Sequence, residues 1–597
     1  MRTRFIPQFF LVMLILVLTA CSSSDNSTPY TNTATQMTAY IEQQMAQHNI
    51  QGLSIALVDG QNVVWTQGFG YADAQSNTPS TPDTLYEIAS ISKTFTAAMI
   101  MQLVEQNLVR LDDPLINYIP AFSMNPTLGA FPFPDGTVTI RSILTHHSGI
   151  PGDLLNANLA RVRYPNYNSQ LLNELQTDYA SYPVDFASAY SNTAISFLAD
   201  VIEAASAKTF EAFSDTLLDQ IGMTRSSFFR DSPRLTGVPA KGYSGGQPYG
   251  PFYQNTPASG GIISSASDMA KYLKMMIAGG IGEGGQVLGS QSMTTMLTRQ
   301  NSAVLLDLDT QAGLVWTLSD AGLDYAGHLC THDGSTVLFN ASLFVLRDYG
   351  LGVVVLSNSR EGLGVVAAIA RQTLKLALEA KTGIKPPPPL PSPVFSPPAA
   401  WTQAQLDGLA GIYVSADNYH VVDSQGQPGA LLLKLNAGTI PGPGGVIIPR
   451  QNGRFSPPAT QEFEIEFTNI SGRTVMIDHE QGRRNMLGEL FIPVPLSAAW
   501  MARLGTYTIT NLNPEDYCWY VPAEARLTPL TLALKYQDGV LVMERVGFFT
   551  SRSVLNPVSD TLAYLRGLGR NLGSAVRIVT VDGHEELQFL DVRYRKN

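Results

Sequence analysis

Ser90 and Lys93 are the two residues whose types and spacing most directly suggest chemistry. They lie in residues 87–95, and apolar side chains that recur afterwards at intervals of four, such as Met99 and Leu103, predict a helix beginning near the serine. Residues three apart share one side of a helix, so the amine would lie beside the hydroxyl. A serine hydroxyl needs a base to act as a nucleophile, and a desolvated lysine whose ammonium form is disfavoured can be that base. The backbone N–H of the serine would also point out of the helix start, where it can stabilise an oxyanion.

The pair alone has a simpler explanation, an N-cap serine followed by a surface lysine, so other residues must support the chemistry. Tyr-Ser-Asn at residues 190–192 precedes a second helix-like run, and His-Asp-Gly-Ser at residues 332–335 leads into a strand-like run. In this order the motifs resemble the serine beta-lactamase and penicillin-binding-protein family, within it the branch of class C beta-lactamases, esterases and D-aminopeptidases. The resemblance spans residues 36–380 and includes further segments: 111–114, 143–151, 221–224, 257–264 and 352–358.

The resemblance implies a role for each residue of the first two motifs. Ser90 would attack the acyl carbon, and Lys93 and Tyr190 would share the proton transfers. The tyrosine, its pKa lowered by nearby cations, would deliver the proton to the leaving group. Asn192 would hydrogen-bond the Lys93 side chain and the substrate amide. Taken singly, a tyrosine is more often a core or loop residue and an asparagine a turn or helix cap.

The third motif departs from the family pattern at one position. Backbone N–H groups of Ser90 and Ser335 would form the oxyanion hole, with Gly334 allowing close approach. Penicillin-recognising members usually have Lys-Thr-Gly here, whereas this chain has His332 two residues before the glycine. A lysine offers a permanent charge to a substrate carboxylate, but an unperturbed histidine is mostly neutral near pH 7. The difference favours esters, or amides and peptides without a carboxylate at that point, over beta-lactams.

Two other patterns compete with this assignment. Lys-Thr-Gly does occur at residues 381–383, but it follows a helix-like run and precedes a proline tract, which indicates a glycine-capped helix end. His328, Cys330 and His332 would share one face of a strand and are legal zinc ligands. A fourth ligand is not evident, and the His-His pair at 146–147 is interpreted as a structured turn for the same reason. We therefore expect no metal and no cofactor.

The N-terminus predicts export. Arg2 and Arg4 precede an apolar stretch at residues 5–18, which is too short for a transmembrane helix. The segment Leu-Thr-Ala-Cys that ends at Cys21 resembles a bacterial lipoprotein signal. Residues 1–20 would then be removed and the cysteine lipidated, which anchors a protein stably to a membrane. The alternative is an ordinary secretory signal with a chance cysteine.

Residues 21–35 are polar and would form a tether, and Ser22 resembles the pattern sent to the outer membrane. We expect an exported lipoprotein at the outer membrane or periplasmic face. The chain has 38 basic and 49 acidic residues, a net charge of −11, which argues against nucleic acid or anionic lipid as partners. Cys330 and Cys518 could form a disulfide or remain free thiols. No protein partner is predicted.

A proline-rich stretch divides the chain. The part after it alternates like β-strands with Gly, Asn and Asp turns, and Gly-x-Tyr occurs at both 411–413 and 505–507. This repetition indicates two related β modules. The expected divisions are a hydrolase domain at 36–384, a linker at 385–400, and β modules at 401–498 and 499–597.

The resemblance implies an α+β fold of the beta-lactamase type, an antiparallel sheet flanked by helices with an all-helical lobe inserted, followed by the all-β modules. A cleft is expected where the nucleophile helix lies between sheet and lobe. We expect a serine hydrolase that forms an acyl-enzyme on Ser90, an esterase or an amidase or D-peptidase on small substrates. A class C-like beta-lactamase or DD-peptidase is the alternative within the enzymes. A non-catalytic protein that binds cell-wall fragments on a hydrolase scaffold is the alternative of another class, although binding alone does not require a nucleophile with two proton-transfer partners.

Overall fold

The computed structural model describes most of the chain after the N-terminal segment. The described residues are 29–129, 131, 136–155, 159–320, 322–388, 396–415, 418–435, 445–458, 463–480, 482–511, 531–546 and 551–597. The expected signal segment, Cys21, Cys518 and the middle of the proline linker lie outside them, so the expectations for these parts stay predictions. Cys330 is buried as a free thiol. Within the described ranges, no helix combines the length and apolarity needed to cross a bilayer.

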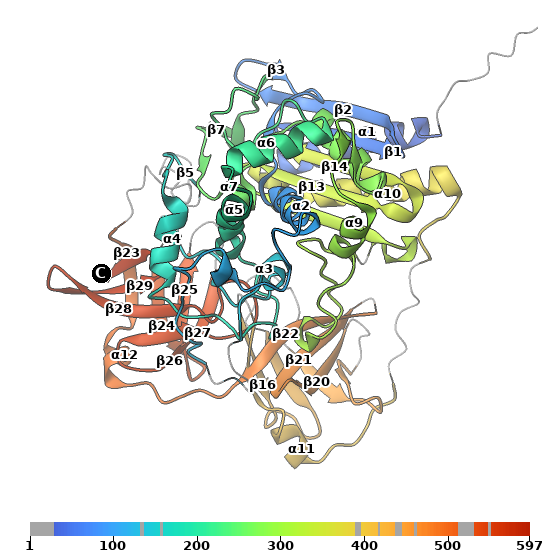
Figure 1. Cartoon of the computed structure of the whole chain (residues 1–597). Coiled ribbons are helices and arrows are strands. Elements are labelled where there is room, and N and C mark those ends of the chain that lie inside the picture. The colour runs from blue at the N-terminus through green and yellow to red at the C-terminus, as the bar shows by residue number, and fades with distance from the viewer. Residues whose placement is uncertain are drawn as a thin grey trace, which may run out of the picture.

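The N-terminal half is built on a six-stranded antiparallel sheet ordered β12-β13-β14-β1-β2-β3 (Figure 1). The central strands are nearly all apolar, because both of their faces are covered. β1 joins the N-terminal hairpin to the last strands, with Leu53 opposite Ser357. The strands are β1 Gly52–Asp59, β2 Asn62–Asp73, β3 Thr78–Pro79, β12 Leu329–Ser335, β13 Asn340–Leu346 and β14 Leu351–Ser357.

Helices cover both faces of this sheet. α1 (Thr31–His48) and α10 (Val365–Thr382) bury apolar residues against the face that carries Leu53, Ile55 and Leu57. α8 (Ala266–Ile277) packs on the opposite face, which carries Ala56 and Val58. The alternation of neighbouring residues between the two cores is the period of two that a strand imposes.

α1 begins inside residues 21–35, which composition favours as a tether. Its first turns are rich in Thr, Asn and Gln, so they look polar, but the residues that recur on one side are buried. These are Thr33, Met37 and Ile41, preceded by Tyr30. The helix therefore starts at Thr31 because a narrow apolar stripe packs on the sheet.

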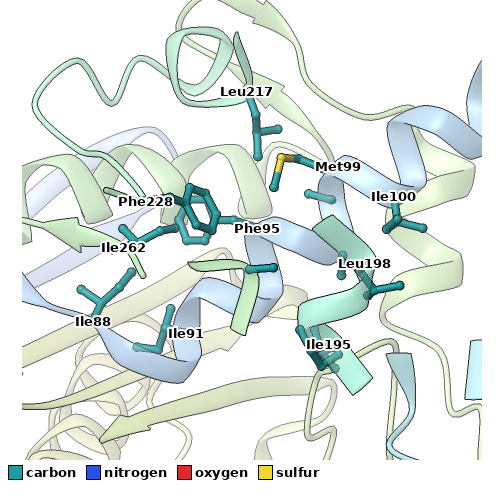
Figure 2. Close-up of a cluster of buried hydrophobic side chains, with 14 of the residues drawn as sticks. Ile88, Ile91, Phe95, Met99, Ile100, Ile195, Leu198, Leu217, Phe228 and Ile262 are labelled. Carbon is teal, nitrogen blue, oxygen red and sulfur yellow. The ribbon is translucent and has the colours of Figure 1, made fainter. Parts of the chain in front are cut away.

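A helical lobe lies between β3 and β12 in the sequence. Its main helices are α2 Ser92–Glu105, α5 Asn192–Ser206, α6 Phe210–Ile221 and α7 Pro257–Gly260. Figure 2 shows Phe95 and Met99 of α2 gathered with Leu217 of α6 and with Ile195 and Leu198 of α5. Every residue of α2 from Ser92 to Leu103 is buried, so this helix is a central element and not a surface one with a single apolar face.

The packing of this lobe gives a stability prediction. Leu198→Ala is expected to lower the free energy of unfolding by about 2–5 kcal/mol, because the fully buried side chain would leave a cavity. Leu305→Ala is the matched control, since that leucine is 61% exposed. Urea unfolding curves of both variants measure the difference. Equal destabilisation by the two changes would contradict the prediction.

The C-terminal part forms two closed eight-stranded antiparallel barrels, orange and red in Figure 1. The first contains β15 Gly411–Val414, β16 Tyr419–Asp423, β17 Leu431–Leu435, β18 Val446–Pro449, β19 Phe455–Ser456, β20 Glu464–Ile470, β21 Arg473–Glu480 and β22 Arg483–Phe491. The second contains β23 Gly505–Ile509, β24 Thr531–Gln537, β25 Val540–Val546, β26 Ser551–Pro557, β27 Leu562–Leu565, β28 Ala575–Val581, β29 His584–Phe589 and β30 Val592–Lys596. The expected α+β fold with C-terminal all-β modules is confirmed.

The two barrels open in the same way. A short helix, α11 (Gln403–Asp407) or α12 (Ala498–Ala502), precedes the first strand of each. The Tyr413 hydroxyl donates to the Leu409 carbonyl oxygen at 2.9 Å, and the Tyr507 hydroxyl donates to that of Arg503 at 2.5 Å. The Gly-x-Tyr repetition therefore marks the same arrangement in both barrels. In each, the tyrosine of the first strand hydrogen-bonds the backbone four residues earlier in the chain.

The second barrel docks on the helical lobe. Tyr182 shares one apolar cluster with Leu565 and Leu572 of this barrel. Its hydroxyl donates to the Gly567 carbonyl oxygen at 2.8 Å. Arg577 adds a cross-module ion pair to a buried aspartate of the lobe. The barrel is thus fixed against the part of the molecule that contains the second motif.

Candidate active site

Ser90 lies in the middle of a 3-10 turn, η1 (Ala89–Ile91), directly before α2. Ala89 has a φ of +49°, in the left-handed region. Such a conformation costs a non-glycine residue on the order of 1–3 kcal/mol and tends to occur at functional sites. The strained turn presents the serine at the start of a long buried helix, as the spacing of the apolar residues predicted.

Lys93 and Tyr190 meet at the serine hydroxyl. Lys93 Nζ lies 3.1 Å from Ser90 Oγ, and Tyr190 Oη lies 2.7 Å from the same oxygen. The lysine side chain is fully buried, and its Nζ also donates to the Ser259 carbonyl oxygen at 2.5 Å. Two groups that can move protons therefore flank one hydroxyl, although Tyr190 is a hundred residues away from it in the sequence.

The electrostatics of the two partners differ. Burial, assisted by the charge of Arg570, holds the pKa of Lys93 well below its usual range. Burial raises the pKa of Tyr190 to about 12, and the Arg570 charge offsets only part of this effect. The expectation that nearby cations lower the tyrosine pKa is therefore wrong, because desolvation outweighs them. The lysine, whose ammonium form is disfavoured, is therefore the better proton acceptor of the two, and the phenol holds its proton near pH 7.

Asn192 has a different partner from the expected one. It is the first residue of α5, and its side-chain amide donates to Asp153 Oδ1 at 2.8 Å and not to Lys93. Asp153 also accepts hydrogen bonds from Arg570 and Asn571 of the second barrel. Sequence reasoning missed this aspartate, because nothing local in the chain links it to residues more than four hundred positions away.

The third motif lies on β12, at the edge of the sheet, against the nucleophile turn. A Cβ at Gly334 would lie 2.1 Å from the Ile88 carbonyl oxygen, so only glycine fits there. His332 Nδ1 donates to the Asp333 carbonyl oxygen at 2.7 Å, and burial lowers the pKa of His332 to about 4. The histidine is therefore neutral near pH 7. Ser335 is the last residue of β12 and lines the same cavity as Ser90.

The close approach of Gly334 predicts a large effect of one methyl group. Gly334→Ala is expected to lower kcat/KM for a turned-over ester by roughly 100-fold, because β12 would be displaced from the nucleophile turn. The control is Gly250→Ala, where an added Cβ meets nothing within 4 Å. Initial rates of both variants provide the measurement. A Gly334→Ala enzyme with wild-type kcat/KM would show that strand and turn need not touch.

His146 is a second residue that sequence reasoning missed. It sits in the predicted turn with a φ of +61°, but its ring also lies 4.3 Å from the Tyr190 ring, centroid to centroid. Its Nδ1 accepts a hydrogen bond from the backbone N–H of Ser191 at 3.2 Å. His147 Nε2 instead lies 2.8 Å from Asp307 Oδ2. His146 therefore packs against the ring of Tyr190 at the cavity, and burial holds its pKa well below its usual range.

The other residues of the two competing patterns have partners of their own. Lys-Thr-Gly at 381–383 ends α10, with Gly383 as its left-handed C-cap, as predicted. His328 is exposed and pairs with Asp348, whereas Cys330 is buried next to the Val345 carbonyl oxygen. In the described part of the chain, no group of three or more His, Cys, Asp or Glu side chains is arranged to hold a metal ion.

A cavity of about 470 Å³ opens over the three motifs. Its lining includes Ser90, Tyr190, His332, Gly334, Ser335 and Arg570. The structure thus brings all three predicted motifs together at one cavity. The side chain of Lys93 is fully buried next to Ser90. A carbonyl carbon entering this cavity would meet a hydroxyl that has the Lys93 amine on one side and the Tyr190 phenol on the other.

The family model of the Beta-lactamase family matches residues 37–378, which include all three motifs. The chain belongs to the Beta-lactamase family. Within this family it is 26% identical to penicillin-binding protein 4 of Amycolatopsis lactamdurans over 62% of this chain and 94% of that protein. It is 28% identical to a beta-lactamase-like protein of Homo sapiens and 27% identical to the protein flp of Staphylococcus aureus. These two matches cover 40% and 32% of this chain, and 49% and 38% of the relatives' own lengths.

Solved structures agree on the fold of this Beta-lactamase family member. The octameric penicillin-binding protein homologue from Pyrococcus abyssi superimposes with a TM-score of 0.51 at 24% identity, over 74% of this chain and 95% of that one. SurE with D-Leu superimposes with a TM-score of 0.50 at 21% identity, over 77% of this chain and 100% of that one. At these identities the likeness concerns the fold alone.

Proposed function

We propose that this Beta-lactamase family member is a serine hydrolase that forms an acyl-enzyme on Ser90. The observation that carries the proposal is the pair of short contacts from Lys93 Nζ and Tyr190 Oη to one serine oxygen. Binding alone needs no such arrangement, whereas nucleophilic catalysis requires an activated hydroxyl and a proton donor for the leaving group.

The proposed reaction follows from the protonation states. Neutral Lys93 accepts the proton of Ser90 as its Oγ attacks the carbonyl carbon. The backbone N–H groups of Ser90 and Ser335 stabilise the oxyanion that develops. Tyr190 gives its proton to the leaving group and regains one from the lysine ammonium. Water then attacks the acyl-enzyme, with the same groups working in the reverse direction.

The proposed substrates are small esters or amides, including D-amino-acid peptides. Neutral His332 stands where penicillin-recognising members usually have a lysine, which favours this choice over beta-lactams. Beta-lactams nevertheless belong in the substrate panel as the second candidate, because one relative bears the name penicillin-binding protein.

A covalent probe tests the proposal. A fluorophosphonate that reacts with activated serines is expected to add once to the purified protein, and digestion should locate the adduct on the peptide containing Ser90. A panel of p-nitrophenyl butyrate, D-amino-acid p-nitroanilides and a chromogenic cephalosporin then sorts the substrate classes. An adduct on another serine, or ligand binding without any adduct or turnover, would favour the non-catalytic binding protein.

We also propose that the enzyme is exported and held by a lipid on Cys21 at the outer membrane or periplasmic face. The support is the arrangement of basic residues, apolar stretch and Leu-Thr-Ala-Cys at residues 1–21. Incorporation of labelled palmitate into the wild type, compared with Cys21→Ser, tests the anchor. Equal labelling of the two proteins would contradict a lipid anchor on Cys21.

A further inference from the structure

Arg570 reaches the active-site cavity from a different module. It lies between β27 and β28 of the second barrel, yet it lines the same cavity as Ser90. Its guanidinium carbon lies 5.1 Å from the centroid of the Tyr190 ring. The side chain is 46% exposed, which leaves much of the group open to the cavity.

The guanidinium is held along one edge. Arg570 Nε and Nη2 lie 2.8 Å and 2.6 Å from Asp153 Oδ2. Asn571 braces the same aspartate, since its side-chain oxygen accepts from the Asp153 backbone N–H at 3.0 Å. Arginine carries five N–H donors in a planar fork. With one edge fixed on Asp153, the N–H groups of Nη1 stay available for an anion, as no described residue pairs with them.

Burial disfavours the charged form of the other basic groups around the cavity. Burial holds the pKa of Lys93 and His146 well below their usual ranges and lowers that of His332 to about 4. Among the described residues that line the cavity, Arg570 is therefore the one permanent cation. It supplies a positive charge in a site whose third motif has lost the lysine of the penicillin-recognising members.

We propose that Arg570 binds a carboxylate of the substrate, so that the second barrel forms part of the specificity pocket. The inference rests on the proposed acyl-enzyme function. Arg570 stacks on Tyr190, which is the proposed proton donor to the leaving group, so the carboxylate belongs to the leaving group. The substrate class is then an ester or amide whose alcohol or amine part bears a free carboxylate, such as a peptide with a free C-terminus. This assignment replaces the expectation, drawn from His332 alone, that the substrate lacks a carboxylate.

Two matched substrates test the inference. Racemic hippuryl-lactate has a carboxylate on its leaving group, and hippuryl-lactamide differs only by having an amide there. The wild type is expected to prefer the acid by about 10- to 100-fold in kcat/KM, mostly through KM, because charged hydrogen bonds are stronger than neutral ones. Arg570→Gln should reduce this preference to near unity, and Arg570→Lys should retain part of it, since charge is kept but the fork is lost.

A control variant separates carboxylate binding from the docking of the barrel. Arg577→Gln removes a cross-module ion pair of the same barrel and should keep the wild-type ratio. If Arg570→Gln lowers both substrates equally, or the wild type shows no preference, the inference is wrong. If no substrate turns over, calorimetric binding of acid and amide to Ser90→Ala decides it. Equal binding would overturn the carboxylate site, while tighter binding of the acid would keep it even if the proposed catalysis fails.

Discussion

Ser90→Ala is expected to reduce kcat for p-nitrophenyl butyrate by on the order of 10⁴-fold or more, to the rate without enzyme. The hydroxyl lies within hydrogen-bond distance of both Lys93 Nζ and Tyr190 Oη, so its loss removes the proposed nucleophile from both partners. An alanine at this site removes one oxygen and keeps the strained turn, so the fold should persist. Stopped-flow or steady-state release of p-nitrophenol measures the effect.

Ser76→Ala is the matched control for this variant. Ser76 is exposed in the turn between β2 and β3, its hydroxyl lies 2.8 Å from the Thr78 hydroxyl, and it is not among the described residues that line the cavity. Its rate should equal that of the wild type. A Ser90→Ala protein that retains wild-type turnover would rule out Ser90 as the nucleophile.

Lys93→Met is expected to lower kcat/KM by roughly 10²- to 10⁴-fold, the usual contribution of a general base. Methionine keeps most of the apolar stem in the buried site, so the loss concerns proton transfer and not packing. Lys381→Met is an informative control, because that lysine belongs to the Lys-Thr-Gly at the end of α10. If Lys381→Met lost activity and Lys93→Met did not, the assignment of the motifs would be reversed.

The pH dependence of activity tests the role of Lys93 independently of the substitution. Burial lowers the pKa of Lys93, so the neutral amine persists to lower pH than for an exposed lysine. Activity is expected to be present above the folded-state pKa and to fall as the pH drops through it, because the ammonium form cannot accept the serine proton. In Lys93→Met this acid limb should disappear from the residual rate.

The sequence predicts the geometry of the candidate site well where the signal is local. Ser90 and Lys93 are one turn apart, and the apolar period after them requires a helix, so their proximity follows from chain geometry. The glycine of the third motif follows from its order along the chain, and the structure adds the reason, a carbonyl oxygen 2.1 Å from where a Cβ would be. The helical context of Lys-Thr-Gly at 381–383 correctly predicts a helix end there.

What the sequence could not predict depends on long-range packing. The sign of the Tyr190 pKa shift is the balance of burial against the charge of Arg570, and burial is known only after folding. The partner of Asn192 is Asp153, whose position is set by a barrel loop. The polar composition of residues 31–35 likewise concealed the start of α1, since only its tertiary packing shows the buried stripe.

The contact between Arg570 and Asp153 joins residues 417 positions apart, which has a consequence for protein synthesis. At about 5–20 residues per second, translation of that interval takes roughly 20–80 s. Before this interval ends, the sheet and helical lobe have been synthesised as far as α10, but the cavity lacks the cation from the second barrel. A chain arrested before residue 570 would thus carry the nucleophile without the group we propose for substrate selection, and a stop codon late in the reading frame would alter selectivity while leaving Ser90, Lys93 and Tyr190 in place.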